Sequence, residues 1–156
     1  MSATLDPSFF GIHENIILTK GGVWLSNGEE ILHENTVRAF SKNIFRCVDG
    51  FEVRLGTERK TIHVEDTLYF VTRLEGSSDI GFNIVLNDGR TLELDSKTLQ
   101  YKPGRLTCRV SHPNDKTHEE AKFLSAAYYE LLKFVDRNDE GFYIVIEGQK
   151  IVLSRE

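Results

Sequence analysis

The residues whose types and spacing could support chemistry lie between Glu58 and Asp66. Glu65 and Asp66 follow a stretch in which Ile62 and Val64 alternate with polar residues, which predicts a strand that ends at this carboxylate pair. Glu58 stands on the turn before that strand. Paired carboxylates can act as general acid and base or bind a cation. We therefore expect Glu58, Glu65 and Asp66 to lie near one another at a sheet rim.

A cluster of carboxylates needs a basic side chain, a cation or a proton to offset its repulsion. Arg38 or Arg73 is the predicted counter-charge. A structural interpretation stays open, in which the Glu65–Asp66 pair ends a strand and caps the next turn while Glu58 forms a surface ion pair with Lys60.

The only tryptophan, Trp24, lies beside a predicted hairpin, where partial burial in the core is the alternative to contact with a ligand. The candidate ligand-binding residues are therefore Glu58, Glu65, Asp66, Arg38, Arg73 and Trp24.

Other motifs for catalysis or metal binding are missing from the sequence. There is no GxSxG elbow, no glycine-rich phosphate loop and no HExxH pair. His112 and His118 lie near acidic residues, but their spacing favours a solvated loop over a metal site. Cys47 and Cys108 make no CxxC and are predicted to be reduced thiols in the core. We predict no catalytic residue, no metal and no cofactor.

Composition restricts the class of protein further. The chain has 156 residues, of which 40% are hydrophobic, and its formal net charge is −5. The negative charge argues against nucleic acid as a partner. No apolar run reaches the ~20 residues of a membrane span, and the N-terminus lacks a basic region before an apolar stretch, so no secretory signal is predicted. We expect a cytoplasmic protein that contacts neither nucleic acid nor membrane.

Two helices are predicted from apolar spacing. Residues 34–47 place Val37, Phe40 and Ile44 on one face, and the Asp49-Gly50 pair ends the helix. A second helix spans about residues 116–135. It begins at a capping box formed by Thr117 and Glu120. The residues predicted to be buried in the core are Phe40, Ile44, Phe82, Ile84, Leu124, Tyr128 and Leu131.

Strands account for most of the remaining chain. The Asn27-Gly28 pair predicts a tight hairpin, because a type I′ turn needs two residues with positive φ. Alternation of apolar and polar residues predicts further strands at 51–55, 61–64, 68–74, 80–86, 91–94 and 105–110, and a closing hairpin of 142–146 with 150–153.

The order of these elements suggests a repeat. A helix, a glycine stop, a strand led by phenylalanine, a polar turn and a second strand occur twice, with Phe51 and Phe142 at matching places. We predict an α+β fold in which two related helix-plus-β-hairpin repeats are joined by an antiparallel β-meander. The predicted divisions of one compact unit are an N-terminal arm 1–20, a first helix–hairpin half 21–76, the meander 77–110 and a second half 111–156.

Short segments in a fixed order resemble a known family. They are Gly22-Val23-Trp24, Ile31, Val37-Arg38-Ala39-Phe40, Asp49-Gly50-Phe51, Glu58, Ile62, Val64-Glu65-Asp66 and Ala127-Tyr128-Tyr129-Glu130-Leu131. Together they are similar to the bacterial family called domain of unknown function 1285, from about Gly21 to Leu153. The resemblance implies a bacterial cytoplasmic protein with repeated α/β motifs and a proposed link to signal transduction, without an established activity.

Three functions stay open at this point. The absence of catalytic motifs favours a non-catalytic ligand-binding or signalling module whose partner is a small molecule or a protein. The carboxylates at Glu58, Glu65 and Asp66 would instead serve a small enzyme. An exposed edge strand would suit a protein-interaction subunit or a homodimer.

Overall fold

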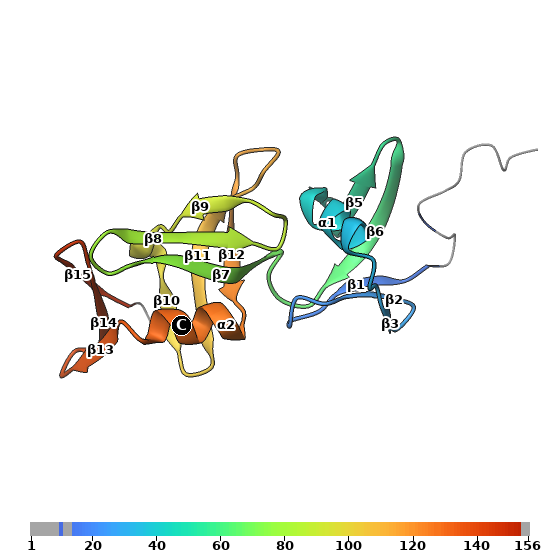
Figure 1. The fold of residues 1–156 in the computed structure, drawn as a ribbon. Coiled ribbons are helices and arrows are strands. Elements are labelled where there is room, and N and C mark those ends of the chain that lie inside the picture. Colours follow the sequence, from blue (N-terminus) through green and yellow to red (C-terminus); the bar gives the residue numbers. More distant parts are fainter. Residues whose placement is uncertain (1–9, 11–13, 154–156) are drawn as a thin grey trace, which may run out of the picture. The chain divides into compact units, whose positions relative to one another are not determined.

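The computed structural model describes residues 10 and 14–153 of the chain. These residues form mainly strands together with two α-helices, which agrees with the predicted α+β class. They gather into two compact units with the boundary between Asp66 and Thr67 (Figure 1). The predicted single body and its first half, residues 21–76, differ from this division, because no described strand of unit 1 pairs with one of unit 2.

Unit 1 holds a six-stranded sheet with the strand order β3-β2-β1-β6-β5-β4. Its strands are β1 (Ile16–Leu18), β2 (Trp24–Ser26), β3 (Glu29–Glu30), β4 (Ile44–Cys47), β5 (Gly50–Leu55) and β6 (Glu58–Val64). β1 runs parallel to β6, and the other neighbours are antiparallel. Part of the predicted N-terminal arm is thus a sheet strand, while its residues 1–9 and 11–13 lie outside the described residues.

The Asn27-Gly28 hairpin is confirmed. The two residues have φ angles of 52° and 86°, and Ser26 pairs with Glu29 across the turn. Positive φ at both central positions gives this turn the twist that antiparallel strands need.

The first helix is shorter than predicted. Helix α1 spans Glu34–Lys42, and Asn43 closes it by donating its backbone N–H to the carbonyl of Phe40 and its side-chain amide to that of Ala39. The predicted last turn, from Ile44 to Cys47, is strand β4, which pairs with β5. Ile44 is buried in strand β4 and would also be buried on the predicted helix face, so the spacing of apolar residues could not distinguish the two.

Unit 2 contains a second six-stranded sheet, in the order β10-β11-β12-β7-β8-β9. Its strands are β7 (Tyr69–Ser77), β8 (Gly81–Leu86), β9 (Thr91–Glu93), β10 (Gln100–Lys102), β11 (Arg105–Ser111) and β12 (His118–Phe123). The first strand, β7, is again parallel to the last, β12. The two sheets therefore share one strand order, and the predicted meander 77–110 is divided between two meanders of three strands each.

The connections at the middle of the two sheets differ in length. In unit 1, β3 is joined to β4 through helix α1, which lies against β5. In unit 2, the corresponding connection from β9 to β10 holds only the short 3₁₀-helix η2 (Ser96–Thr98), which lies against β11.

The predicted second helix is largely strand. Residues 118–123 form β12, which is hydrogen-bonded to β11 on one side and β7 on the other. Two neighbouring strands satisfy its backbone groups, and this outweighs the capping box predicted from Thr117 and Glu120. Helix α2 spans only Ser125–Leu132, with Leu124 as its N-cap residue.

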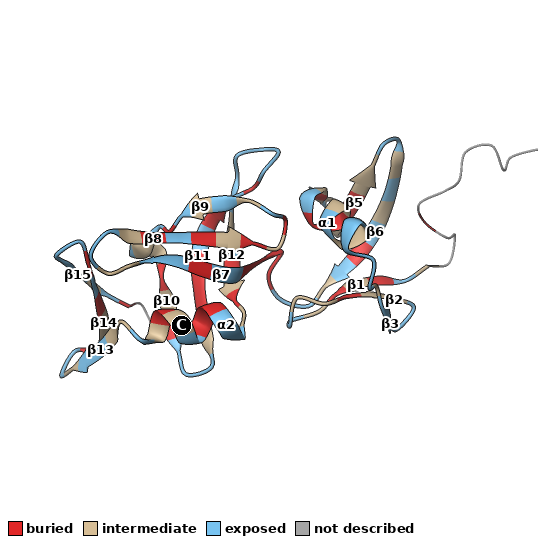
Figure 2. Ribbon diagram, viewed as in Figure 1, coloured by how far each residue is buried: buried red, intermediate tan, exposed pale blue. Residues whose placement is uncertain are grey.

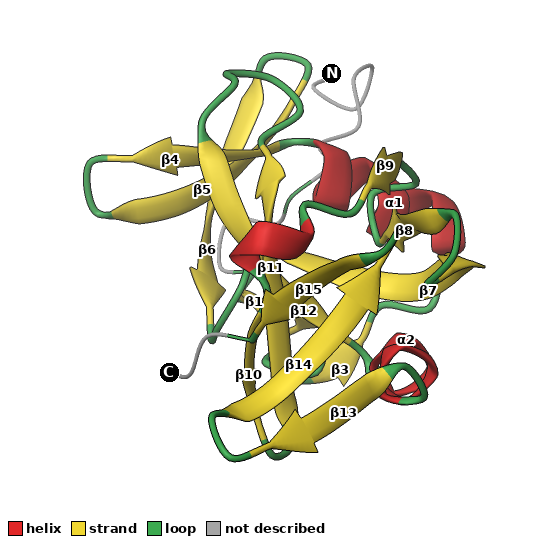
Figure 3. Cartoon of the chain, turned by 90° about the vertical axis from the view of Figure 1, so that its left-hand side faces the viewer, coloured by secondary structure: helices red, strands yellow, loops and turns green. Residues whose placement is uncertain are grey.

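A third, three-stranded sheet follows α2 (Figure 3). It consists of β13 (Val135–Asn138), β14 (Gly141–Ile146) and β15 (Gln149–Val152), all antiparallel. The predicted closing hairpin is therefore confirmed as β14 and β15. Phe51 and Phe142 lie in strands as predicted, each paired across a hairpin with an arginine, Arg46 and Arg137.

Buried residues are interspersed with half-buried and exposed ones along the strands of both six-stranded sheets (Figure 2). In unit 2, β8 contributes Phe82, Ile84 and Leu86, while α2 buries Tyr128 and Leu131. All predicted core residues are buried except Leu124, which is half-buried at the start of α2. Among the described residues, neither helix is long and apolar enough to cross a membrane.

Ile84 and Ile80 form a matched pair for testing this core. Ile84 is fully buried, whereas Ile80, predicted in the same alternating set, precedes β8 and is 76% exposed. Ile84→Ala should lower the free energy of unfolding by about 2–5 kcal/mol. Ile80→Ala should change it by less than about 0.5 kcal/mol. Urea unfolding followed by circular dichroism measures both, and equal losses would show that the face of β8 is misassigned.

Candidate functional site

The predicted carboxylate cluster is not assembled. Glu58 begins strand β6, and Glu65 comes directly after the strand ends at Val64. A seven-residue strand rises about 3.3 Å per residue, so roughly 20 Å separates its two ends. Glu65 accepts a hydrogen bond from the backbone N–H of Lys20 at 2.9 Å, which ties the end of β6 to the segment after β1. The expected meeting of Glu58 with Glu65 and Asp66 is therefore wrong, because the strand between them is extended.

The other candidates occupy separate places. Arg38 is exposed on α1. Arg73 lies on β7 of unit 2, where its guanidinium pairs with Glu75 at 2.9 Å. Trp24 is 1% exposed, packs edge-on against Phe40 and donates its indole N–H to the hydroxyl of Ser41 at 3.1 Å. Trp24 thus belongs to the core of unit 1, as the structural alternative held.

Metal ligands do not gather in the part of the chain that the structure describes, where no group of three or more His, Cys, Asp or Glu side chains could hold an ion. His112 is buried, and its Nδ1 accepts the backbone N–H of Asn114 at 3.1 Å and lies 3.2 Å from a carboxylate oxygen of Asp115. His118 lies on β12 instead.

Unit 2 has several surface hollows. The largest described, about 490 Å³, includes the carboxylates of Glu93 and Glu147 but no cationic side chain. Another, about 280 Å³, is lined by Tyr101, Phe142 and other residues around β13. A hollow of about 360 Å³ over β10, β11 and β12 holds side chains of both signs, and we call it the Arg109 hollow. Its lining residues are Lys97, Thr98, Gln100, Cys108, Arg109, His118, Glu119 and Glu120.

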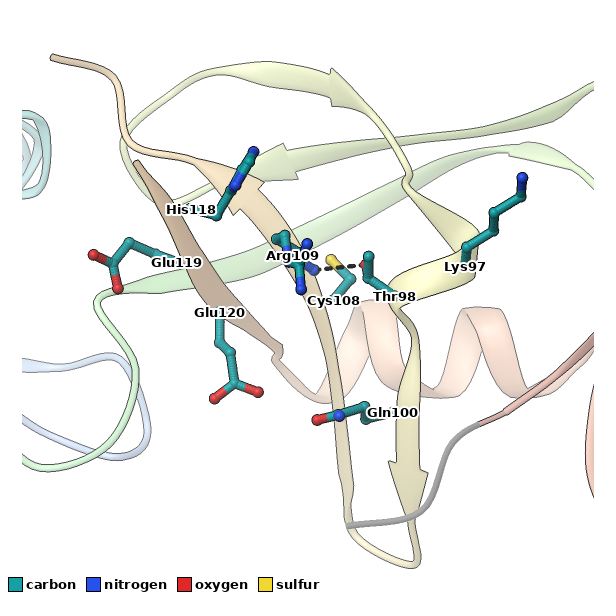
Figure 4. A pocket seen from close by; sticks show the side chains of 8 residues that line it. All are labelled: Lys97, Thr98, Gln100, Cys108, Arg109, His118, Glu119 and Glu120. Atoms are coloured by element: carbon teal, nitrogen blue, oxygen red, sulfur yellow. Dashed lines mark hydrogen bonds between the residues drawn. The ribbon is translucent and has the colours of Figure 1, made fainter. Parts of the chain in front are cut away.

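Arg109 occupies the middle of this hollow, between His118 and Thr98 (Figure 4). Its backbone N–H donates to the Thr98 hydroxyl at 2.8 Å, which fixes η2 beside β11. Its side chain is exposed and has no ion-pair or hydrogen-bond partner among residues 10 and 14–153. An arginine carries a fork of N–H donors that matches carboxylate and phosphate oxygens.

Neutral and acidic groups complete the lining. Gln100 on β10 and Glu120 on β12 point toward one another below Arg109, whereas Glu119 points away from it (Figure 4). The hydroxyl of Thr107 donates to Glu120 at 3.4 Å. The hollow therefore offers a guanidinium for an anionic group and amide and carboxylate oxygens for hydrogen-bond donors.

A second hollow, of about 260 Å³, shares Arg109 and His118 with the first. We call it the Glu93 hollow; it is lined by Leu92, Glu93, Asp95, Arg109, Val110, Ser111 and His118. Arg109 thus borders two hollows, one with basic and acidic side chains and one whose other charged groups are the carboxylates of Glu93 and Asp95.

The sequence prediction missed these residues. It assigned His118 and Glu120 to a helix, although polar residues alternate with Ala121 and Phe123 along β12. That period of two was a usable signal for a strand. The contact between Thr98 and Arg109 continues the register of the β10–β11 hairpin, in which Gln100 pairs with Thr107, so this hairpin was a usable signal for it.

Burial of Cys108 limits the chemistry of the Arg109 hollow. The residue is 1% exposed, and burial raises the pKa of its thiol from 9.0 to about 12, with a smaller contribution from the negative charge of Asp95. A protonated thiol is a poor nucleophile. Cys108 therefore contributes no nucleophile to the Arg109 hollow.

The two cysteines should differ in reactivity. In the native protein at about pH 8, iodoacetamide should alkylate the half-buried Cys47 and leave Cys108 at least about 100-fold slower, because only the thiolate reacts. The rate at Cys108 should rise only as pH approaches its raised pKa. Peptide mass spectrometry over a time course measures both rates, and unfolding in guanidinium should make them similar. Equal rates in the native state would contradict the burial of Cys108.

Comparisons with known proteins identify solved structures with a similar fold. No protein-family model matches the sequence, and no curated protein matches it. A crystal structure of a DUF1285 family protein from Silicibacter pomeroyi DSS-3 is similar with a TM-score of 0.60 and 18% identity, over 90% of this chain and 79% of that one. A DUF1285 family protein from Shewanella baltica OS155 gives a TM-score of 0.58 and 15% identity, over 78% of this chain and 92% of that one.

These likenesses agree with the family resemblance found in the sequence, and at such identities they show the fold alone. The chain has the fold of DUF1285 family proteins.

Proposed function

We propose that unit 2 is a non-catalytic binding module for a small polar molecule that carries an anionic group. The observation that carries this proposal is the unpartnered guanidinium of Arg109 in the middle of the Arg109 hollow. An arginine side chain held at a fixed backbone position and surrounded by hydrogen-bonding groups is suited to bind a carboxylate or phosphate. The volume of about 360 Å³ is within the range of small-molecule sites.

Binding is favoured over catalysis by the lining itself. The thiol of Cys108 is held protonated by its burial. His118 and Glu120 could transfer a proton, but the one thiol among the lining residues is not available to them as a nucleophile. The small enzyme based on Glu58, Glu65 and Asp66 loses its support, because those residues do not cluster.

The predicted internal repeat is part of the proposal. One constant offset along the chain carries Ile44–Cys47 onto Val135–Asn138 and Gly50–Leu55 onto Gly141–Ile146. The same offset carries Arg46 and Phe51 onto Arg137 and Phe142, and each arginine lies over its phenylalanine ring, 5.0 and 5.5 Å from the centroid. These matches support a repeated strand pair, β4–β5 and β13–β14; the shared strand order of the two sheets is a separate correspondence, because it relates β5 to β11. The signalling role, the cytoplasmic location and the homodimer stay predictions.

Arg109→Gln tests the proposed site. Removal of the guanidinium should weaken binding of small anions at least about tenfold, since hydrogen bonds to a charged group contribute roughly 1.5–3 kcal/mol. Acetate, butyrate and inorganic phosphate are the probes, and chemical-shift titration of the isotope-labelled protein measures their affinities and the residues affected.

Arg73→Gln is the matched control. Arg73 is also an exposed arginine on the same sheet, but it is already paired with Glu75. Its loss should leave the affinities unchanged. Equal affinities in wild type and Arg109→Gln, or binding of no probe by wild type, would contradict the proposed function.

A further inference from the structure

Unit 1 contains an arginine on the strand that corresponds to the strand of Arg109. Arg54 and Arg109 lie on β5 and β11, the second strands from the edge in the two sheets of shared order. Each donates its backbone N–H to the segment that precedes the edge strand, Arg54 to the carbonyl of Asn43 and Arg109 to the hydroxyl of Thr98. The two arginines therefore lie on corresponding strands near the same end of the ladder, Arg54 one residue and Arg109 two residues beyond the last pair with the edge strand.

The guanidinium of Arg54 is bound by a carboxylate of its own unit. Its Nε donates to Glu52, two residues earlier on the same face of β5, at 2.5 Å. Glu52 is only 8% exposed and also lies 3.8 Å from Arg59 on β6. In unit 1, the arginine guanidinium is thus bound by a carboxylate from the same face of the same strand.

In unit 2 this carboxylate is missing. The residue two before Arg109 is Thr107, which shares its strand face because side chains alternate. The connection that lies against β11 is η2 rather than a nine-residue helix, and residues of η2, β10, β11 and β12 line the Arg109 hollow. A carboxylate from outside the chain can therefore take the place at Arg109 that Glu52 takes at Arg54.

The surrounding charges select the rest of the ligand. The two hollows that Arg109 borders contain the cations of Lys97 and Arg109 against four carboxylates, those of Glu93, Asp95, Glu119 and Glu120. A doubly charged phosphate is disfavoured by this excess of negative charge, whereas a single carboxylate is favoured when an amino group accompanies it. Glu93 and Asp95 offer carboxylates to such an amino group on the far side of Arg109.

Resting on the proposed function, we infer that the ligand of unit 2 is an amino-acid-like zwitterion. Its carboxylate binds the guanidinium of Arg109, and its amino group lies in the Glu93 hollow near Glu93 and Asp95. The amino group defines the ligand class of the Arg109 hollow. If no amino group binds near Glu93 and Asp95, the proposed binding of anions at Arg109 still stands.

Matched probes test both contacts on the full chain. Glycine, β-alanine and γ-aminobutyrate vary the distance between the charges, and acetate, propionate and butyrate lack the amino group. At least one amino acid should bind about threefold to tenfold more tightly than its matched acid and more tightly than inorganic phosphate. The double variant Glu93→Gln, Asp95→Asn should remove this difference, and the matched acid should bind at least as tightly as it does to wild type, because two negative charges are lost.

Thr107→Glu tests the comparison between the units. It installs at Arg109 the carboxylate that Arg54 already has, and it should abolish binding of amino acids and plain acids. Thr107→Gln has nearly the same shape without the charge and should keep binding within about threefold of wild type. Circular dichroism of both variants checks that the sheet is intact, and unchanged binding by a folded Thr107→Glu variant would overturn the inference.

The possible failures are distinguishable. Equal binding of each amino acid and its matched acid, both lost in Arg109→Gln, would overturn the zwitterion and keep the proposed anion site. Tighter binding of phosphate than of any amino acid would do the same. Binding of no probe by wild type would overturn both the ligand class and the proposed function.

Discussion

The parallel pairing of the first strand of each unit with its last strand is the constraint on which both sheets depend. β1 meets β6 through Ile17 and Leu18, and β7 meets β12 along Tyr69, Phe70 and Val71. Each pair joins two antiparallel meanders into one six-stranded sheet. Such a pairing brings together segments far apart along the chain, and its loop-closure cost is offset only when the intervening strands are in place. The strand order, the buried faces and the surface hollows all follow from this closure.

The connection between the two meanders then decides what each sheet presents to solvent. In unit 1 this connection contains α1, whose Phe40 packs on Trp24 and whose Ser41 accepts the indole N–H. In unit 2 the same connection is reduced to η2, and the side chains of β10, β11 and β12 line an open hollow. One strand order thus supports a unit with a helix in this connection and a unit with a 3₁₀-helix there and a polar depression beside it.

The two units also differ in the partners of their arginines on β5 and β11. Arg54 is bound to Glu52 and stacks on Phe45 at 4.3 Å from the ring centroid, so its charge is used within the fold. Arg109 has Thr107 in place of that glutamate and Glu120 across the strand pair. An exposed ion pair contributes little stability, so an arginine without one costs the fold little. Its charge remains available for a ligand.

Local sequence patterns were sufficient to predict those turns and strands whose conformation depends on neighbouring residues alone. They determined the Asn27-Gly28 turn, the strands begun by Phe51 and Phe142 and the buried face of β8, because positive φ and a period of two are local properties. Only tertiary pairing decided that Ile44–Cys47 and His118–Phe123 are strands, since an apolar spacing compatible with a helix was overridden by ladder hydrogen bonds to β5, β11 and β7. The site was decided in the same way. Glu58 and Glu65 are near in sequence but lie at opposite ends of an extended strand, whereas Glu120 lies opposite Arg109 only because β12 pairs with β11 as a strand.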